Sequence, residues 1–168
     1  MCCSTADPQT LTAAVVTVSD SCARGEREDR SGPAVAQLLE KLDFVIVARH
    51  VVPDESIQIQ NLIIRLAREV RLIVTTGGTG IAPRDVTPEA TMAVCERLID
   101  GVAERMRAEG VKETPLAALS RGVCGVRGWA LILNLPGSPA GAVESLAAVA
   151  SLIPHALQLL SGKTDHPH

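Results

Sequence analysis

Short, continuous apolar runs alternate along the chain with longer segments in which apolar residues recur every three or four positions. The continuous runs cover residues 13–18, 44–52, 72–75 and 129–133. Runs of this length and composition predict strands that are covered on both faces, as in a parallel sheet. The helical spacing predicts amphipathic helices after the first three strands and at the end of the chain, the first of them carrying Val35, Leu38, Leu39 and Leu42.

Several residues mark where the expected helices begin and end. Ser31 and Thr87 are placed to cap helices, and Pro88 fits a first helical turn because it has no N–H to satisfy. We expect the helix opened by Thr87 to run to about Ile99 and a short helix to follow over 101–110. The glycine-rich segment 120–128 predicts a loop or an edge hairpin. Pro154 is expected to kink or divide the last helix.

The alternation of strands and helices predicts an α/β fold, a three-layer α/β/α sandwich with a mostly parallel central sheet. No internal repeat or linker divides the chain, so we expect a single domain over residues 11–162. Residues 1–10 and 163–168 are polar and are expected to form a flexible leader and a flexible tail.

Composition narrows the class of protein. The 168 residues are 46% hydrophobic but include one Phe, one Trp and no Tyr, so aliphatic side chains must fill the core. The net charge of −3 and the lack of a Lys/Arg run disfavour nucleic-acid or anionic-membrane partners. We expect no apolar run of membrane-spanning length. The odd number of cysteines, without a C-x-x-C pair, disfavours a zinc site and fits reduced thiols in the cytoplasm.

The segment 75–91, TTGGTGIAPRDVTPEAT, carries the strongest chemical signal. It follows an apolar strand and contains the glycine loop Gly77, Gly78, Thr79 and Gly80. Such a backbone can approach a ligand closely and cradle phosphate with its amides, and Asp85 could then hold an accompanying metal. The alternative is a tight turn between strand and helix, since neither a Walker A motif nor a dinucleotide fingerprint is present.

Other polar loops also follow predicted strands. They are Ser19-Asp20-Ser21, the turn at Asp54 and the segment 134–139. Parallel strands bring their carboxyl ends to one edge, so these loops could converge with the glycine loop on one cleft. Asp54 could instead be a helix-start acid that favours the helix dipole. Together the loops predict a site for a phosphorylated ligand with magnesium, which is held by one or two carboxylates and by substrate phosphates.

At these residues the sequence resembles the molybdopterin-binding fold family, and in particular its molybdopterin adenylyltransferases. The resemblance extends from Val15 to Gly162 and rests on five segments in order: VVTVSDSCARGEREDRSGP, VVPDE, TTGGTGIAPRDVTPEAT, LSRGVCGVRG and LILNLPGSP. It implies transfer of AMP from Mg-ATP to the terminal phosphate of molybdopterin, with release of pyrophosphate. It also implies a cytoplasmic homotrimer that passes its product to a molybdate-insertion protein.

The resemblance implies a role for each matching residue. Asp54 and Asp85 would be the catalytic acids and would hold Mg²⁺. The residues expected at the nucleotide and its phosphates are Ser19, Asp20, Gly77, Gly78, Thr79 and Gly80. Those expected at molybdopterin are Ser120, Arg121, Asn134, Pro136, Gly137, Ser138 and Pro139.

Two other functions remain open from the sequence. A carrier or scaffold of the same fold would bind molybdopterin without consuming ATP or releasing pyrophosphate. An unrelated α/β protein that binds a nucleotide or a sugar phosphate would fail to bind molybdopterin. The presence of both Asp54 and Asp85 favours the transferase over the carrier.

Overall fold

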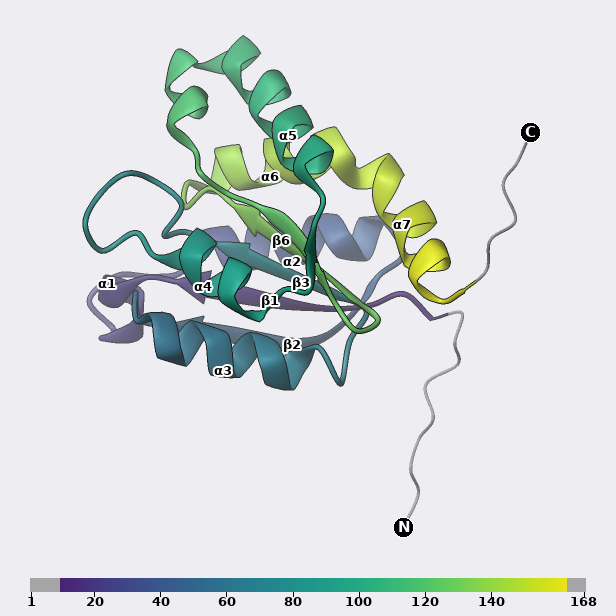
Figure 1. The fold of residues 1–168 in the computed structure, drawn as a ribbon. Helices are drawn as coiled ribbons and strands as arrows, with labels where there is room; N and C mark the ends of the chain where they lie inside the picture. The colour runs from purple at the N-terminus through teal and green to yellow at the C-terminus, as the bar shows by residue number, and fades with distance from the viewer. Residues whose placement is uncertain (1–9, 163–168) are drawn as a thin grey trace.

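Six strands form one mixed sheet in the computed structural model, which describes residues 10–162 (Figure 1). In chain order the strands are β1 (Thr12–Val18), β2 (Val45–Val52), β3 (Leu72–Thr76), β4 (Arg97–Leu98), β5 (Cys124–Arg127) and β6 (Ala130–Leu135). Their spatial order is β2-β1-β3-β6-β5-β4. The first four in this order pair in parallel, and β5 and β4 add an antiparallel edge. The expected mostly parallel sheet is therefore confirmed.

Helices cover both faces of the sheet, so the three-layer architecture is also confirmed (Figure 1). The helices are α1 (Asp20–Ala23), α2 (Ser31–Lys41), α3 (Ser56–Leu66), α4 (Thr87–Val94), α5 (Asp100–Glu113), η1 (Pro115–Leu119), α6 (Pro139–Val149), η2 (Ala150–Leu152) and α7 (Ile153–Leu160). One face packs against α2, α5, α6 and α7, and the other packs against α3 and α4. The expected leader and tail lie almost wholly outside the described residues.

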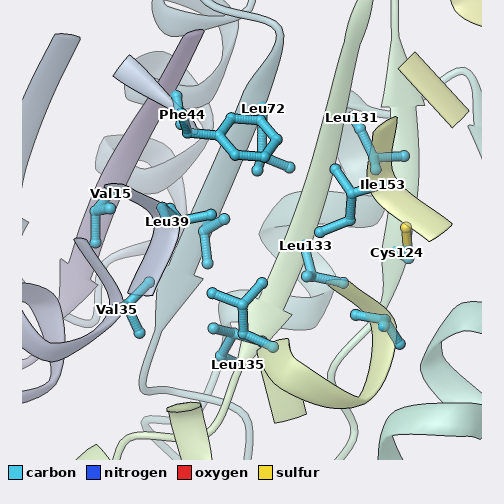
Figure 2. Close-up of a cluster of buried hydrophobic side chains, with 14 of the residues drawn as sticks. Val15, Val35, Leu39, Phe44, Leu72, Cys124, Leu131, Leu133, Leu135 and Ile153 are labelled. Atoms are coloured by element: carbon cyan, nitrogen blue, oxygen red, sulfur yellow. The ribbon is translucent and has the colours of Figure 1, made fainter. Parts of the chain in front are cut away.

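Alternate side chains of the buried strands fill two separate hydrophobic layers. In β1, Val15 points to the layer under α2 and α6, whereas Val16 points to the layer under α3. Figure 2 shows the first layer, where Leu133 and Leu39 lie among other aliphatic side chains beside Phe44. Strands β1, β3 and β6 are buried on both faces and have no polar side to expose, which is why their sequences read as continuous apolar runs. The expectation of two covered faces is wrong for the edge strand β2, where Val45, Val47 and Val51 are exposed.

The helix that begins at Thr87 is shorter than the sequence predicts. It ends at Val94, and Cys95 already has an extended backbone with ψ near 141°. Arg97 and Leu98 instead pair with β5, and the amide of Ile99 donates to the Cys124 carbonyl at 2.8 Å. The free edge of β5 needs hydrogen-bond partners, and this requirement overrides the local helical spacing.

The expected caps at Ser31 and Thr87 are wrong. The amide of Gly32 at the start of α2 donates at 2.9 Å to the Asp29 carboxylate instead. Thr87 donates its hydroxyl to the carbonyl of Gly77 at 2.9 Å and so holds the glycine loop. The Ser31 hydroxyl lies 2.8 Å from the Thr76 hydroxyl and bonds to it. Both side chains thus have partners in other segments, which local spacing cannot reveal.

Two predictions about the second half of the chain are confirmed. The glycine-rich segment 120–128 leads into an antiparallel hairpin of β5 and β6, and Gly128 takes a positive φ of 55° in its turn. The last helix is divided, because α6 ends at Val149 and Pro154 lies in the first turn of α7.

One apolar segment is longer than the sequence analysis allowed. Pro139–Leu160 spans 22 residues with a mean hydropathy of 1.4, which by length and composition alone could cross a membrane. The expectation that no run reaches this length is therefore wrong. Leu146, Val149, Ile153 and Leu157 are buried in the layer described above, an arrangement typical of a core helix.

We predict that Leu133→Ala lowers the free energy of unfolding by about 2–5 kcal/mol, because it leaves a cavity in a closely packed layer. Leu133 is fully buried. Leu116→Ala is the matched control, since Leu116 is 70% exposed and its loss should change stability by less than about 0.5 kcal/mol. Urea unfolding followed by circular dichroism measures both, and equal effects would contradict this account of the core.

Candidate functional site

A cleft of about 360 Å³ lies at the carboxyl ends of the parallel strands. The structure brings together here parts of all the polar loops singled out in the sequence. The expected site residues that line it are Ser19, Asp54, Gly77, Gly78, Asp85, Gly137, Ser138 and Pro139. Gly137 packs close to Gly77, because a Cβ on Gly137 would lie 3.3 Å from the Gly77 Cα. The two glycine-containing loops thus meet in the cleft.

The glycine loop is held in a conformation that side chains would block. Gly77 and Gly78 have positive φ angles of 90° and 64°. A Cβ on Gly77 would collide with the carbonyl of Val18, and one on Gly78 would collide with the Thr87 hydroxyl. The Gly77 amide donates to Leu135 O at 3.1 Å, and the Thr87 amide donates to Gly78 O at 3.1 Å. The loop is therefore fixed by β6 on one side and by α4 on the other.

Asp20 and Asp54 bind each other's backbone across the loops after β1 and β2. The Asp20 amide donates to Asp54 Oδ2 at 2.9 Å, and the Asp54 amide donates to Asp20 Oδ1 at 3.0 Å. The carboxylate of Asp54 thus caps the start of α1, whereas the helix that follows Asp54, α3, has no side-chain cap. The alternative that Asp54 acts on the dipole of α3, the helix that follows it, gains no support.

The two carboxyl groups have opposite pKa shifts. Burial raises the pKa of Asp54, and the nearby charges of Asp20 and Asp85 raise it further. Hydrogen bonds from the Arg84 guanidinium lower the pKa of Asp20 below its ordinary value. Asp54 is thus a partly buried carboxyl group beside two others, and a nearby cation would stabilise its ionised form.

Asp85 lies at the far end of the glycine loop and closes a tight turn. Its Oδ2 accepts from the Ala82 amide at 2.9 Å, and its own amide donates to Ala82 O at 2.9 Å. A Cβ on Gly80 would lie 2.7 Å from Asp85 Oδ2, so the absence of a side chain at Gly80 makes room for this carboxylate. Asp85 and Asp54 then face the same cleft.

The carboxylates fit a magnesium ion that arrives with a phosphorylated ligand. Within residues 10–162 no group of three or more His, Cys, Asp or Glu side chains is arranged to hold a metal unaided. Magnesium does not need such a group, because one or two carboxylates and the oxygens of a bound phosphate suffice. Asp54 and Asp85 meet that requirement, and their proximity makes a cation favourable.

Arg121 supports the glycine loop from behind the cleft. Its Nε donates to Gly80 O and its Nη2 to Asp85 O, both at 2.7 Å. Its Nη1 pairs with Glu89, and the pKa of Glu89 is lowered by this contact. The Arg121 amide donates to Thr79 O at 2.8 Å. Arg121 therefore holds both ends of the segment 80–85 in place.

Asn134 is buried beneath the site and does not line the cleft. Its Nδ2 donates to the hydroxyls of Thr75 at 3.0 Å and Thr91 at 2.9 Å. Its Oδ1 accepts from the Val123 amide at 3.2 Å. One side chain thus joins β3, α4 and the segment before β5. With Ser120 and Pro136 it faces a separate hollow of only about 30 Å³.

Residues 27–30 of the charged segment after α1 also line the cleft, a placement that sequence reasoning missed. Asp29 anchors the segment by accepting from the Thr17 hydroxyl at 2.8 Å, beside its bond to the amide at the start of α2. The available signal was an aspartate three residues before Gly32 in the first turn of α2, the spacing of a capping carboxylate.

The sequence of the chain matches a known protein family and several named proteins. The sequence profile of a family described as "Probable molybdopterin binding domain" matches residues 14–155. A Helicobacter pylori protein named molybdopterin adenylyltransferase is 40% identical over 92% of this chain and 90% of its own length. The Escherichia coli protein of that name is 38% identical over 91% and 87%. The Drosophila melanogaster protein cinnamon, a molybdenum cofactor synthesis protein, is 43% identical, but the chain spans only 26% of its length.

Solved structures agree with these sequence matches. The molybdopterin biosynthesis enzyme MoaB of Thermus thermophilus superposes with a TM-score of 0.87 at 50% identity, covering 92% of this chain and 98% of that one. A structure of MogA superposes with a TM-score of 0.84 at 42% identity, covering 89% and 99%.

We predict that thiol reagents label Cys22 much faster than Cys95 or Cys124. Cys22 lies in the open cleft, whereas burial raises the pKa of Cys95 to about 11 and that of Cys124 to about 12. Because the thiolate is the reactive form, both should stay unlabelled at about pH 8 until the protein unfolds. Iodoacetamide labelling with peptide mass mapping measures each site, and rapid labelling of native Cys124 would contradict the structure.

Asn134→Ala should lower the free energy of unfolding by about 1–3 kcal/mol, because it leaves the buried hydrogen-bond partners of the Asn134 amide group unsatisfied. Ser138→Ala provides a comparison on the cleft surface, where the side chain is exposed. It removes only the cap on the Gly141 amide, a loss of about 1 kcal/mol. Urea unfolding of both variants measures the difference, and an undiminished stability of Asn134→Ala would refute the role of this network.

Proposed function

The chain belongs to the family of molybdopterin-binding domains, and from this premise we propose that it is a molybdopterin adenylyltransferase of molybdenum cofactor biosynthesis. The observation that supports the reaction is the placement of Asp54 and Asp85 in one cleft beside the backbone of Gly77 and Gly78. Its substrates are ATP and molybdopterin, and its products are adenylylated molybdopterin and pyrophosphate.

The reaction is a substitution at the α-phosphorus of ATP. An oxygen of the terminal phosphate of molybdopterin forms a bond to this phosphorus, and the bond to the bridging oxygen of pyrophosphate breaks. The attacking phosphate is already ionised, so no strong general base is required. Both reactants are anions, and alignment and charge neutralisation supply most of the rate.

Asp54 and Asp85 are the residues that hold Mg²⁺ in this proposal. When bound, the ion neutralises phosphate oxygens and stabilises charge on the departing pyrophosphate. The raised pKa of Asp54, caused by burial and by the nearby carboxylates, supports this assignment. Asp20 holds Asp54 in place through their paired backbone contacts.

The remaining cleft residues bind and orient the two substrates. We assign the nucleotide and its phosphates to Ser19, Asp20 and the loop of Gly77, Gly78, Thr79 and Gly80. Arg27 and Arg30 line the same cleft and supply positive charge for the phosphates. The turn of Gly137, Ser138 and Pro139 opens α6, whose amino terminus favours the phosphate of molybdopterin.

Four residues expected at molybdopterin, together with Asp20, Thr79 and Gly80, lie outside the cleft lining. Ser120, Asn134 and Pro136 face the small hollow behind it, and Arg121 contacts the segment 80–85. We propose that Arg121 and Asn134 act by holding the glycine loop and its strand. Ser120 and Pro136 shape the wall on the molybdopterin side.

The wider cellular setting is part of the same proposal. We infer a cytoplasmic homotrimer that hands adenylylated molybdopterin to a molybdate-insertion protein. Size-exclusion chromatography with light scattering tests the trimer, and a pull-down with such a protein tests the hand-off.

The second candidate is a non-catalytic molybdopterin carrier of the same fold. One observation favours it: both acids already accept backbone amides, Asp54 from Asp20 and Asp85 from Ala82, which is a role that needs no metal. Pyrophosphate release separates the two functions. A carrier binds molybdopterin tightly and releases no pyrophosphate from Mg-ATP.

We predict that Asp85→Ala reduces molybdopterin-dependent pyrophosphate release by at least about 10²-fold, the loss typical of removing one charge-stabilising group. Because Asp85 is in a partly exposed turn, circular dichroism should show an intact fold. Glu104→Ala, an exposed acid on α5, is the control and should retain full activity. Normal turnover by a folded Asp85→Ala protein would refute the assignment.

A further inference from the structure

The guanidinium of Arg84 connects the loops that follow three neighbouring strands. Its Nε and Nη2 both donate at 2.9 Å to the carboxylate of Asp20, after β1. Its Nη2 also donates at 3.0 Å to Glu55, after β2. Arg84 itself lies in the loop after β3 and is adjacent in sequence to Asp85. A displacement of Arg84 therefore displaces Asp85 as well.

The segment 80–85 has two arginine attachments on opposite sides. Arg121 binds its first and last carbonyls, those of Gly80 and Asp85, from the side of β5. Arg84 ties its outer part to Asp20 and Glu55 on the side of β2. Residues 81–84 are otherwise exposed, so these contacts fix where the Asp85 carboxylate lies.

The positive charge of Arg84 also reduces repulsion among the neighbouring carboxylates. Asp54 and Asp85 line the cleft, Asp20 contacts Asp54, and Glu55 follows Asp54 in the chain. Arg84 is shared between Asp20 and Glu55. Without the guanidinium, repulsion would favour moving the loop of Asp85 away from the loops of Asp20 and Asp54. The two parallel hydrogen bonds of an arginine guanidinium resist that movement better than the single charge of a lysine ammonium would.

We propose that Arg84 is a positioning residue for adenylyl transfer: by bridging Asp20 and Glu55 it holds the segment 80–85 so that Asp85 faces Asp54 across the cleft. This inference rests on the proposed function for its catalytic consequence. Its structural part, the attachment of the segment, can be tested without any turnover.

Hydrogen exchange tests the attachment directly. Amides of residues 80–86 should exchange several-fold faster in Arg84→Gln than in the wild-type protein, and Arg84→Lys should fall between them. The control is Arg24→Gln, because Arg24 forms an equally exposed bidentate pair with Glu26, at 2.8 and 3.0 Å, within a single loop. It should leave exchange in 80–86 unchanged. Unchanged exchange in a folded Arg84→Gln protein would overturn the proposal.

Kinetics then tests the positioning role. Arg84→Gln should lower kcat for pyrophosphate release about tenfold or more, because small misplacements of a reacting group are costly. Glu55→Ala should lower kcat less, since the Asp20 contact remains. In the Arg84→Gln background, Glu55→Ala should have no further effect, because the interaction it removes is already absent.

A different kinetic pattern would show that Arg84 binds ATP and does not position Asp85. If Arg84 instead binds the triphosphate directly, Arg84→Gln raises KM for Mg-ATP with little change in kcat, and Glu55→Ala frees the guanidinium and does not lower kcat. That pattern would refute a positioning role. If the wild-type protein shows no turnover, the proposed transferase function fails, and hydrogen exchange still decides whether Arg84 fastens the segment.

Discussion

Parallel pairing of β1 with β2 and β3, and of β3 with β6, is the constraint on which the site depends. Parallel strands bring their carboxyl ends to one edge, so the four loops that follow them must meet there. Of these strands, β1, β3 and β6 are buried on both faces by two aliphatic layers, which leaves the loops as the place for polar chemistry. The core thereby fixes where charges can gather.

Gathering carboxylates at this edge creates an electrostatic problem that the structure solves with arginines and backbone amides. Asp20 and Asp54 accept each other's amides, Arg84 bridges Asp20 and Glu55, and Arg121 holds the segment that carries Asp85. Burial, together with the charges of Asp20 and Asp85, raises the pKa of Asp54. In the proposed reaction the negative charge of these carboxylates attracts the metal that accompanies ATP. The same arrangement therefore serves folding and catalysis.

Much of the fold could be predicted from local patterns. The four parallel strands, the helices α2 and α3 and the division of the last helix at Pro154 all follow from hydrophobic spacing and proline geometry. The errors lie where partners are distant in sequence. The helix from Thr87 ends early because residues 97 and 98 pair with the edge of β5. The hydroxyls of Ser31 and Thr87 do not cap helices, because they bond to Thr76 and Gly77.

For the site, the sequence by itself determined the candidates for chemistry: Asp54, Asp85 and the glycines at 77, 78 and 80 follow predicted strands, in loops with residue types suited to phosphate and metal. Tertiary structure alone decided what each polar side chain does. Asn134 is buried and donates to two buried hydroxyls, and Arg121 donates to backbone carbonyls. Residues 27–30 of the charged segment line the cleft. The reason is that spacing and propensity are local, whereas hydrogen bonds and charges choose their partners across distances of 30 residues or more in the chain.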